Sequence, residues 1–413
     1  MRFRAVAIVV FAALAVSVPQ SALAAREEAA PPVQFAKADL SAGTRAGVAP
    51  GAPLTLASSG LTTDTYTDPF GYGDISYQSG TWTSEWTSVP FAFDELVASW
   101  NATTPESTWI RVEMQARGSG RATKFYTIQI WASGDGDIHR TSVRAQGDAD
   151  GFIAIDTFIR SKKAAPLDSY RLRIKLYRKI GSGATPSVRF AGAMTSAAVK
   201  FDIPSDFSGR ARDLNVPRLS QEVHAGHFPE FDGGGEAWCS PTSTAMVLRY
   251  WKSGPTVAQL AAFPGATHAD GEVDHAARYV YDWNYQGAGN WPNNTAYAAT
   301  FGLSGFVTRL RSLNEAKMFI DAGIPLVASI NGKLPGFLFD KTNGHLLVIR
   351  GFTSTGDVIA NDPAVLSDPE AKKTYGRADF ENVWLGGSAG IVYVIYPAGK
   401  SLPPNVPGLP RNW

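Results

Sequence analysis

The chain has 413 residues, of which 44% are hydrophobic and 11% aromatic, enough material for more than one packed core. Its formal charge is +1, and it becomes −1 if Arg2 and Arg4 leave with a cleaved leader. This balance excludes an electrostatic case for binding nucleic acid or an anionic membrane surface. We therefore expect two domains and a neutral or mixed-charge partner.

The first residues have the features of an export signal. Arg2 and Arg4 precede an apolar stretch, residues 5–18, and Ala22-Leu23-Ala24 follows it. A charged start, a short apolar middle and a small-residue cleavage site are typical of secretory signals. The apolar stretch is too short to span a bilayer comfortably, and no later segment approaches a membrane helix. The sequence predicts a signal peptide over residues 1–24 and a secreted, extracellular protein without a membrane span.

Residues 25–60 are dominated by Ala, Pro, Gly, Ser and Thr, with few large apolar groups. Such a segment buries too little surface to offset the entropy lost on ordering. We expect a flexible leader here.

Between residues 61 and 203 the hydrophobic pattern has a period of two. In residues 109–117 the apolar side chains at even positions alternate with Arg111, Glu113 and Gln115. Similar runs occupy residues 91–100, 124–132, 151–159 and 170–177, separated by clusters of Gly, Asp, Ser and Pro. Strands with one wet and one buried face form antiparallel sheets, and many short ones predict an all-β sandwich domain over 61–203.

Residues 212–398 carry helical patterns first and strand patterns later, which indicates an α+β domain. The boundary between the two domains falls within 204–214. The expected helices are 242–251, 274–285 and one that starts at the capping box Ser312–Glu315 and ends at Gly323. The expected strands are 325–330, 344–352, 357–360 and 390–396.

Cys239 is the only cysteine, so an internal disulfide is impossible. It stands at the start of a helical pattern, with Ser240 as a candidate cap and Pro241 as the first helical residue. The aligned peptide dipoles at such a position favour a thiolate. A free cysteine is otherwise commonly a small buried hydrophobe. Its position in an exported chain favours the interpretation as a nucleophile.

A nucleophilic cysteine needs a base, and histidines occur at 139, 224, 227, 268, 275 and 345. His345 opens an apolar strand, where the alternative is a strand-end histidine bonded to a carbonyl. The strand returns after the turn 353–356. If that loop has four residues, residue 345 pairs with 364 and Asp362 is its diagonal neighbour. A three-residue loop would make Asn361 the partner instead. We expect Asp362 to orient the imidazole.

Gln221 lies upstream of the cysteine. Its side-chain NH₂, together with the backbone N–H of Cys239, would form an oxyanion hole. A solvated surface glutamine is the alternative.

The order Gln221, Cys239, His345, Asp362 resembles that of papain-like cysteine peptidases, and more closely the C39-like peptidase family. The motifs that carry the resemblance are 216–221, Trp238 to Ser243, Gly344 to Phe352, Asn361-Asp362-Pro363, and the ending 375–394. It implies a papain-like α+β fold. It also implies that Cys239 attacks a carbonyl, His345 acts as base, Asp362 orients it and Gln221 supplies an oxyanion donor. No metal or organic cofactor is implied.

Two features depart from the family pattern. Eighteen positions separate Gln221 from Cys239, because residues 224–236 form an insertion. The best-known members sit on membrane transporters and cleave leader peptides after double glycine. This chain shows neither transporter helices nor an ATPase, so we do not extend that specificity to it.

The insertion itself could hold a metal. His224 and His227, with Asp232 and Glu236 nearby, are possible zinc ligands. Gly226 and the glycine run 233–235 make a helical ligand face unfavourable, so we expect a mobile loop.

The first domain carries Trp82, Trp86, Trp100, Trp109 and Trp131, which could stack on sugars. The alternative places most of them in the sandwich core.

These patterns predict an exported cysteine peptidase that cleaves peptide or amide bonds in a peptide or protein substrate through an acyl-enzyme. One alternative is a cell-wall amidase or acyltransferase that uses the same thiol. Another is a non-catalytic protein whose sandwich binds a glycan or a surface ligand.

Overall fold

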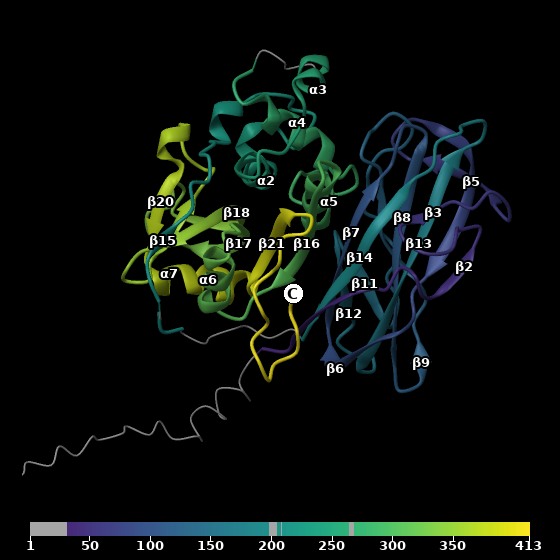
Figure 1. Cartoon of the computed structure of the whole chain (residues 1–413), viewed down its shortest axis with the longest axis horizontal. Helices are drawn as coiled ribbons and strands as arrows, with labels where there is room; N and C mark the ends of the chain where they lie inside the picture. Colours follow the sequence, from purple (N-terminus) through teal and green to yellow (C-terminus); the bar gives the residue numbers. More distant parts are fainter. Residues whose placement is uncertain (1–30, 198–204, 208, 264–267) are drawn as a thin grey trace, which may run out of the picture. The chain divides into compact units, whose positions relative to one another are not determined.

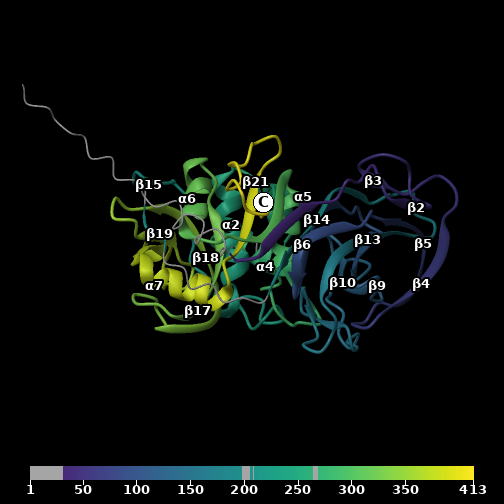
Figure 2. The ribbon, with the colours of Figure 1, turned by 90° about the horizontal axis from the view of Figure 1, so that it is seen from below.

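The computed structural model describes residues 31–197, 205–207, 209–263 and 268–413 (Figures 1 and 2). The signal peptide expected over 1–24 lies outside the described residues. Residues Pro31–Trp413 pack as one unit by their contacts. Within the described ranges, no helix has both the length and the apolar character needed to cross a bilayer.

The first half of the chain forms two antiparallel sheets. In one sheet the strand order is β1, β14, β7, β12, β11, with β3 beside β14. Its members are β1 (Val33–Lys37), β3 (Leu54–Thr55), β7 (Glu95–Thr103), β11 (Gly151–Ala154), β12 (Thr157–Arg160) and β14 (Ser187–Ser196).

The second sheet has the order β10, β8, β13, β5, β2, and three further strands pair along it. Its members are β2 (Thr44–Ala46), β4 (Thr62–Asp68), β5 (Gly73–Thr83), β6 (Thr87–Phe93), β8 (Thr108–Gly118), β9 (Arg121–Ala122), β10 (Tyr126–Trp131) and β13 (Leu167–Lys179). Alternate side chains of both sheets meet in one hydrophobic core. Trp100 of β7 and Ile174 of β13, for example, belong to it and are fully buried. In β13 the period of two reflects one mainly buried face, whereas residues 96–102 of β7 are buried on both faces.

Three expectations for this half are corrected. Residues 31–60, expected to belong to a flexible leader, contribute β1, β2 and β3, because Val33 and Leu54 are fully buried in cores. The expected strand 91–100 is two strands, β6 and β7. The expected strand 151–159 is a hairpin, in which Ala154 pairs with Thr157. Its two-residue turn has Ile155 at φ 59° and contains no glycine or asparagine to mark it.

The tryptophans are mostly core residues. Trp82, Trp100, Trp109 and Trp131 are fully buried, so these four are not available to stack on a sugar. Trp86 is partly buried, and the guanidinium groups of Arg117 and Arg171 lie 4.4 and 4.7 Å from its ring centre.

The second half forms one antiparallel sheet with helices. Its order is β16, β21, β17, β18, β19, β20, with β15 paired to β18. The strands are β15 (Arg212–Asp213), β16 (Leu303–Arg309), β17 (Leu326–Lys333), β18 (Lys341–Phe352), β19 (Val358–Asn361), β20 (Lys372–Tyr375) and β21 (Ile391–Pro397).

Helices α2, α4 and α5 contact one another and appear together in Figure 1. The α-helices are α2 (Cys239–Tyr250), α3 (Val257–Ala262), α4 (Gly271–Val280), α5 (Trp291–Thr300), α6 (Leu313–Asp321) and α7 (Arg377–Glu381). Short 3-10 turns η1 (Glu222–His224), η2 (Gly235–Ala237) and η3 (Asp368–Ala371) and the π-helical turn η4 (Asn382–Gly386) complete the set.

Most expected elements of this half are present with shifted ends. The expected helix 242–251 starts three residues earlier, at Cys239, and 274–285 is α4, which starts and ends earlier. At α6 the Ser312 hydroxyl accepts from the Glu315 N–H at 3.2 Å, as expected of a cap. The Glu315 carboxylate instead accepts from the Arg311 N–H, so the capping box is only half formed. Helix α5 and strand β16 had no counterpart among the expected elements.

Strand β16 is bonded directly to β7 of the first half. The side chain of Asn101 donates to the Gly305 carbonyl at 2.7 Å and accepts from its N–H at 3.2 Å. The Ser99 hydroxyl accepts from the Val307 N–H at 2.9 Å, and Arg309 forms an ion pair with Glu95 at 2.5 Å. These bonds fix the first half against the sheet that carries the site.

Replacing Asn101 by alanine should lower the free energy of unfolding by about 3 kcal/mol. Both polar backbone groups of the buried Gly305 would lose their side-chain partner, and each unsatisfied group costs about 1–3 kcal/mol. Urea unfolding followed by tryptophan fluorescence measures the change. Asn343→Ala, at an exposed position, serves as the control and should change the value by less than about 0.5 kcal/mol. Equal effects of the two substitutions would contradict the expected role of Asn101.

Candidate functional site

Cys239 is the first residue of helix α2. Trp238 precedes the helix as its N-cap residue and makes no side-chain cap hydrogen bond. The thiol is partly exposed, and the first N–H groups of a helix have no acceptor within it. The expected cap is wrong: the Ser240 hydroxyl is fully buried and lies 2.9 Å from the hydroxyl of Tyr393 on β21. Ser240 therefore anchors the helix to the sheet.

His345 and Asp362 meet across the hairpin of β18 and β19. The Nε2 atom of His345 lies 2.8 Å from Oδ1 of Asp362. The loop has five residues rather than four, since Phe352 pairs with Val358. A bulge between Ile349 and Gly351 restores the parity, so Val348 pairs with Asn361 and Asp362 keeps the diagonal position.

Asn361 points away from the histidine. Its side chain accepts from Arg350 at 3.0 Å and donates to the carbonyls of Val216 and Pro217. The alternative, in which Asn361 contacts the imidazole, is therefore wrong.

The carboxylate of Asp362 is held by further donors that the sequence did not reveal. The Tyr375 hydroxyl donates to Oδ2 at 2.6 Å, and the Ala364 N–H donates to Oδ1 at 3.0 Å. Both Asp362 and Tyr375 are 1% exposed, so the carboxylate is fixed in a dry environment. Tyr375 comes from the four-residue strand β20, whose pairing with β19 has no local signal in the sequence.

The imidazole of His345 is also within hydrogen-bond reach of the Cys239 sulfur, and this contact favours the protonated ring. Burial alone would lower the pKa of His345. The neighbouring Asp362 carboxylate and the hydrogen bonds to Asp362 and Cys239 outweigh burial and raise this pKa from 6.5 to about 10. The ring is therefore charged at neutral pH. The structure thus brings together the cysteine, histidine and aspartate that the sequence singled out.

A second bond sets the distance between helix α2 and strand β18. One turn after Cys239, the Ser243 hydroxyl donates to the Leu346 carbonyl at 3.1 Å. Leu346 is the neighbour of His345, so this bond holds the thiol and the imidazole in register.

Gln221 lines the same pocket as Cys239 and His345. Its side-chain NH₂ donates to the Glu236 carbonyl at 2.7 Å and to the Glu222 carboxylate at 3.1 Å. Its Oε1 is buried without a hydrogen-bond partner among the described residues. The Gln221 side chain therefore lies in the pocket of Cys239, but its NH₂ group already donates two hydrogen bonds.

The insertion 224–236, expected as a loop, forms turns whose side chains contact α4. Its glycines allow a tight turn, with Gly233 and Gly234 at positive φ. A Cβ on Gly235 would come within 2.4 Å of the Gln221 carbonyl. His224 is fully buried, because its ring and that of His227 pack against Asp274 of α4. Asp232 and Glu236, the other possible zinc ligands, bond elsewhere. Asp232 accepts a hydrogen bond from the Ala288 N–H, and Glu236 accepts one from the Gly226 N–H.

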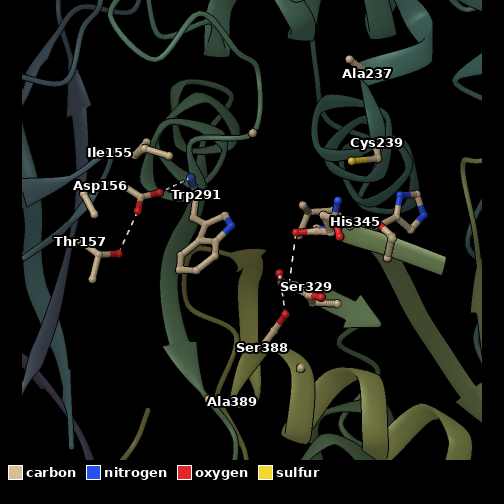
Figure 3. A pocket seen from close by; sticks show the side chains of 18 of the residues that line it. Ile155, Asp156, Thr157, Ala237, Cys239, Trp291, Ser329, His345, Ser388 and Ala389 are labelled. Atoms are coloured by element: carbon tan, nitrogen blue, oxygen red, sulfur yellow. Dashed lines mark hydrogen bonds between the residues drawn. The ribbon is translucent and has the colours of Figure 1, made fainter. Parts of the chain in front are cut away.

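Cys239 and His345 open onto a pocket of about 1100 Å³ (Figure 3). The opposite wall in Figure 3 is the hairpin turn of the first half, with Ile155, Asp156 and Thr157. Asp156 is fixed to the start of α5, since its carboxylate accepts from the Trp291 N–H at 2.8 Å. Burial raises the pKa of Asp156 to about 6. Any molecule that enters the pocket meets residues of both halves.

A cysteine at a helix start that shares a histidine with a carboxylate is the arrangement of thiol peptidases. Comparison with known families agrees with this class. Residues 213–389 match the family model described as "Peptidase_C39 like family", and residues 33–196 match "Peptidase C39 N-terminal domain". The chain belongs to the C39-like peptidase family, as its motifs predicted.

Comparisons with individual proteins are weaker. No curated protein matches the sequence significantly. A Bacillus anthracis protein classed as a C39-like peptidase is 20% identical, with a TM-score of 0.30, and the match covers 47% of this chain and all of that one. A xylan-binding module (11% identity, TM-score 0.19) matches over 40% of this chain and 98% of its own. A module bound to β-1,4-galactotriose (10%, 0.17) matches over 39% and 87%. Likenesses at these scores carry no argument here.

Replacing Asp362 by asparagine should lower stability most at acidic to neutral pH. The folded-state pKa of His345 is raised, so its contribution is complete below about pH 6.5 and is lost as the pH rises through about 10. We expect a loss of about 3 kcal/mol at pH 6 that shrinks towards pH 10. Urea unfolding across this range measures it.

Asp340→Asn is the matched control, because that carboxylate is exposed. It should give a small and pH-independent change. A constant difference between wild type and Asp362→Asn from pH 6 to 10 would show that Asp362 does not hold the imidazolium.

Proposed function

We propose that this protein is a secreted cysteine peptidase with Cys239 as its nucleophile. One observation carries the proposal: a single buried imidazole, His345, contacts both the Cys239 thiol and the Asp362 carboxylate at the wall of an open pocket. The family match over 213–389 supports peptidase chemistry.

The proposed protein has two domains. We assign the two sheets of the first half, several of whose strands share a hydrophobic core, to a β-sandwich, and residues 212–398 to a papain-like α+β domain. A helix that presents the cysteine and an antiparallel sheet that presents the histidine support this assignment.

In the proposed reaction the proton of the Cys239–His345 pair lies on the imidazole, and the thiolate sulfur attacks the carbonyl carbon of the substrate. The C–S bond forms and the carbonyl oxygen becomes an oxyanion. The imidazolium then protonates the leaving nitrogen, and the C–N bond breaks. Water, deprotonated by the neutral imidazole, attacks the thioester, which releases the acid and restores the thiol.

Asp362 balances the positive imidazolium throughout these steps, and it is held in place by Tyr375 and the Ala364 N–H. The fixed carboxylate costs no reorganisation at the moment of reaction. The oxyanion accepts hydrogen bonds from the backbone N–H of Cys239 and from the side-chain NH₂ of Gln221. To donate to the oxyanion, Gln221 must break one of its two present hydrogen bonds. The bond to Glu222, at 3.1 Å, is the longer of the two.

The first test is a digest of unfolded protein and of purified peptidoglycan by the wild-type chain, with product identification by mass spectrometry. We expect cleavage of the unfolded protein, and a loss of at least about 10³-fold in kcat for Cys239→Ala. His345→Ala should also slow alkylation of Cys239 by iodoacetamide near neutral pH. Cleavage of peptidoglycan alone would favour a cell-wall amidase. Cleavage of neither, with equal alkylation rates, would indicate a non-catalytic protein.

The second test separates the two side chains at the oxyanion position. Gln221→Ala should lower kcat by about 10²–10³-fold, as the loss of an oxyanion donor does. Glu222→Ala removes only a competing acceptor of the same amide, so kcat should stay the same or rise. Steady-state kinetics on one peptide substrate compares them. If Gln221→Ala retains wild-type kcat, the glutamine is structural and not a donor.

A further inference from the structure

Three of the six histidines converge on one carboxylate that the proposed reaction does not use. Asp274, in α4, is fully buried. The Nδ1 atoms of His224 and His227 each lie 3.1 Å from its Oδ1, and Nδ1 of His268 lies 2.9 Å from its Oδ2. We name these four residues the His–Asp cluster.

We propose that the His–Asp cluster binds a zinc ion, with His224, His227 and Asp274 as ligands. The ligand atoms of these three residues all lie within 4.8 Å of one another. In a tetrahedral zinc site with bonds of 2.0–2.1 Å, neighbouring ligand atoms are about 3.3 Å apart, and the two distances from Nδ1 to Oδ1, 3.1 Å each, are close to this value. Two imidazole nitrogens with one carboxylate suit zinc better than calcium or magnesium, which prefer oxygen ligands.

His268 has a supporting position. It bonds the second oxygen of Asp274, and its ring stacks on that of His227 with 3.7 Å between centres. Partners of this kind orient a ligating carboxylate from outside the coordination sphere. The side chains of His227 and His268 are 24% and 31% exposed, so solvent can reach the cluster and complete the fourth position.

Charge also favours a cation at this place. Asp274 is fully buried, and a buried carboxylate is stable only with a cation or hydrogen-bond donors around it.

The ion would have a structural role. His224 and His227 belong to the segment between Gln221 and Cys239, and Asp274 belongs to helix α4. Zinc would fasten this segment to α4 and so fix the approach to Cys239. In this way the bound metal would hold Gln221 and Cys239 at a fixed distance, although eighteen positions separate them in the sequence.

The test uses the full chain with Cys239→Ala, so that zinc cannot bind the thiol. After treatment with a chelator and desalting, calorimetric titration with Zn²⁺ should show one ion per chain, and zinc should raise Tm. Adding His227→Ala, at a partly exposed ligand, should weaken binding by at least about 100-fold and abolish the Tm increase. Asp274→Asn, a second variant of nearly the same shape, should do the same.

His139→Gln is the matched control, because His139 forms a His–Asp pair with Asp68 outside the cluster. It should leave zinc binding unchanged. Circular dichroism at 20 °C verifies that each variant is folded. Absence of zinc binding in the Cys239→Ala chain would overturn the proposal and leave a metal-free hydrogen-bonded cluster. Equal affinities with and without His227 would overturn it too. Neither result bears on the peptidase chemistry, which is measured separately.

Discussion

The arrangement of the site depends on one buried contact, the hydrogen bond between His345 and Asp362. An isolated buried imidazole would be neutral, because burial favours the uncharged form. The adjacent carboxylate reverses this preference and keeps the ring protonated up to about pH 10. The pair needs a fixed geometry, since a misplaced partner leaves a charge buried without compensation. Tyr375, Ala364 and the β18–β19 register supply that geometry.

Helix α2 is positioned against this pair by polar contacts as well as by packing. Ser240 reaches Tyr393 on β21, and Ser243 reaches the Leu346 carbonyl on β18. Both serines are fully buried, so each bond forms away from competing water. The helix therefore has two fixed points on the sheet within its first two turns. A cysteine at its first residue has little freedom to move away from the imidazole.

The sequence predicted the central pair because strand parity is a local property. In a hairpin, alternate residues of each strand lie on the same face. The loop is one residue longer than expected, but the bulge in β18 compensates for this, so Asp362 still lies on the same face as His345. Features that depend on distant packing were not predictable in this way. The burial of Val33 needs the partner strand β14, and the convergence of His268 and Asp274 on His224 needs the folded insertion. No spacing in the sequence encodes such contacts. Ile155 gave no signal either, because a β-branched residue at positive φ is contrary to the usual turn preferences.

The position of Ile155 has a consequence for how the two halves work together. A β-branched residue at positive φ is strained, and such strain persists only where surrounding contacts fix it. Here the neighbouring Asp156 is bound to the start of α5, and its turn faces Cys239 across the pocket. The bonds of Asn101 and Ser99 to strand β16 hold the same half of the chain against the sheet. The first half is therefore a structural part of the cleft. Its residues Ile155, Asp156 and Thr157 supply one wall of the pocket that a substrate must enter.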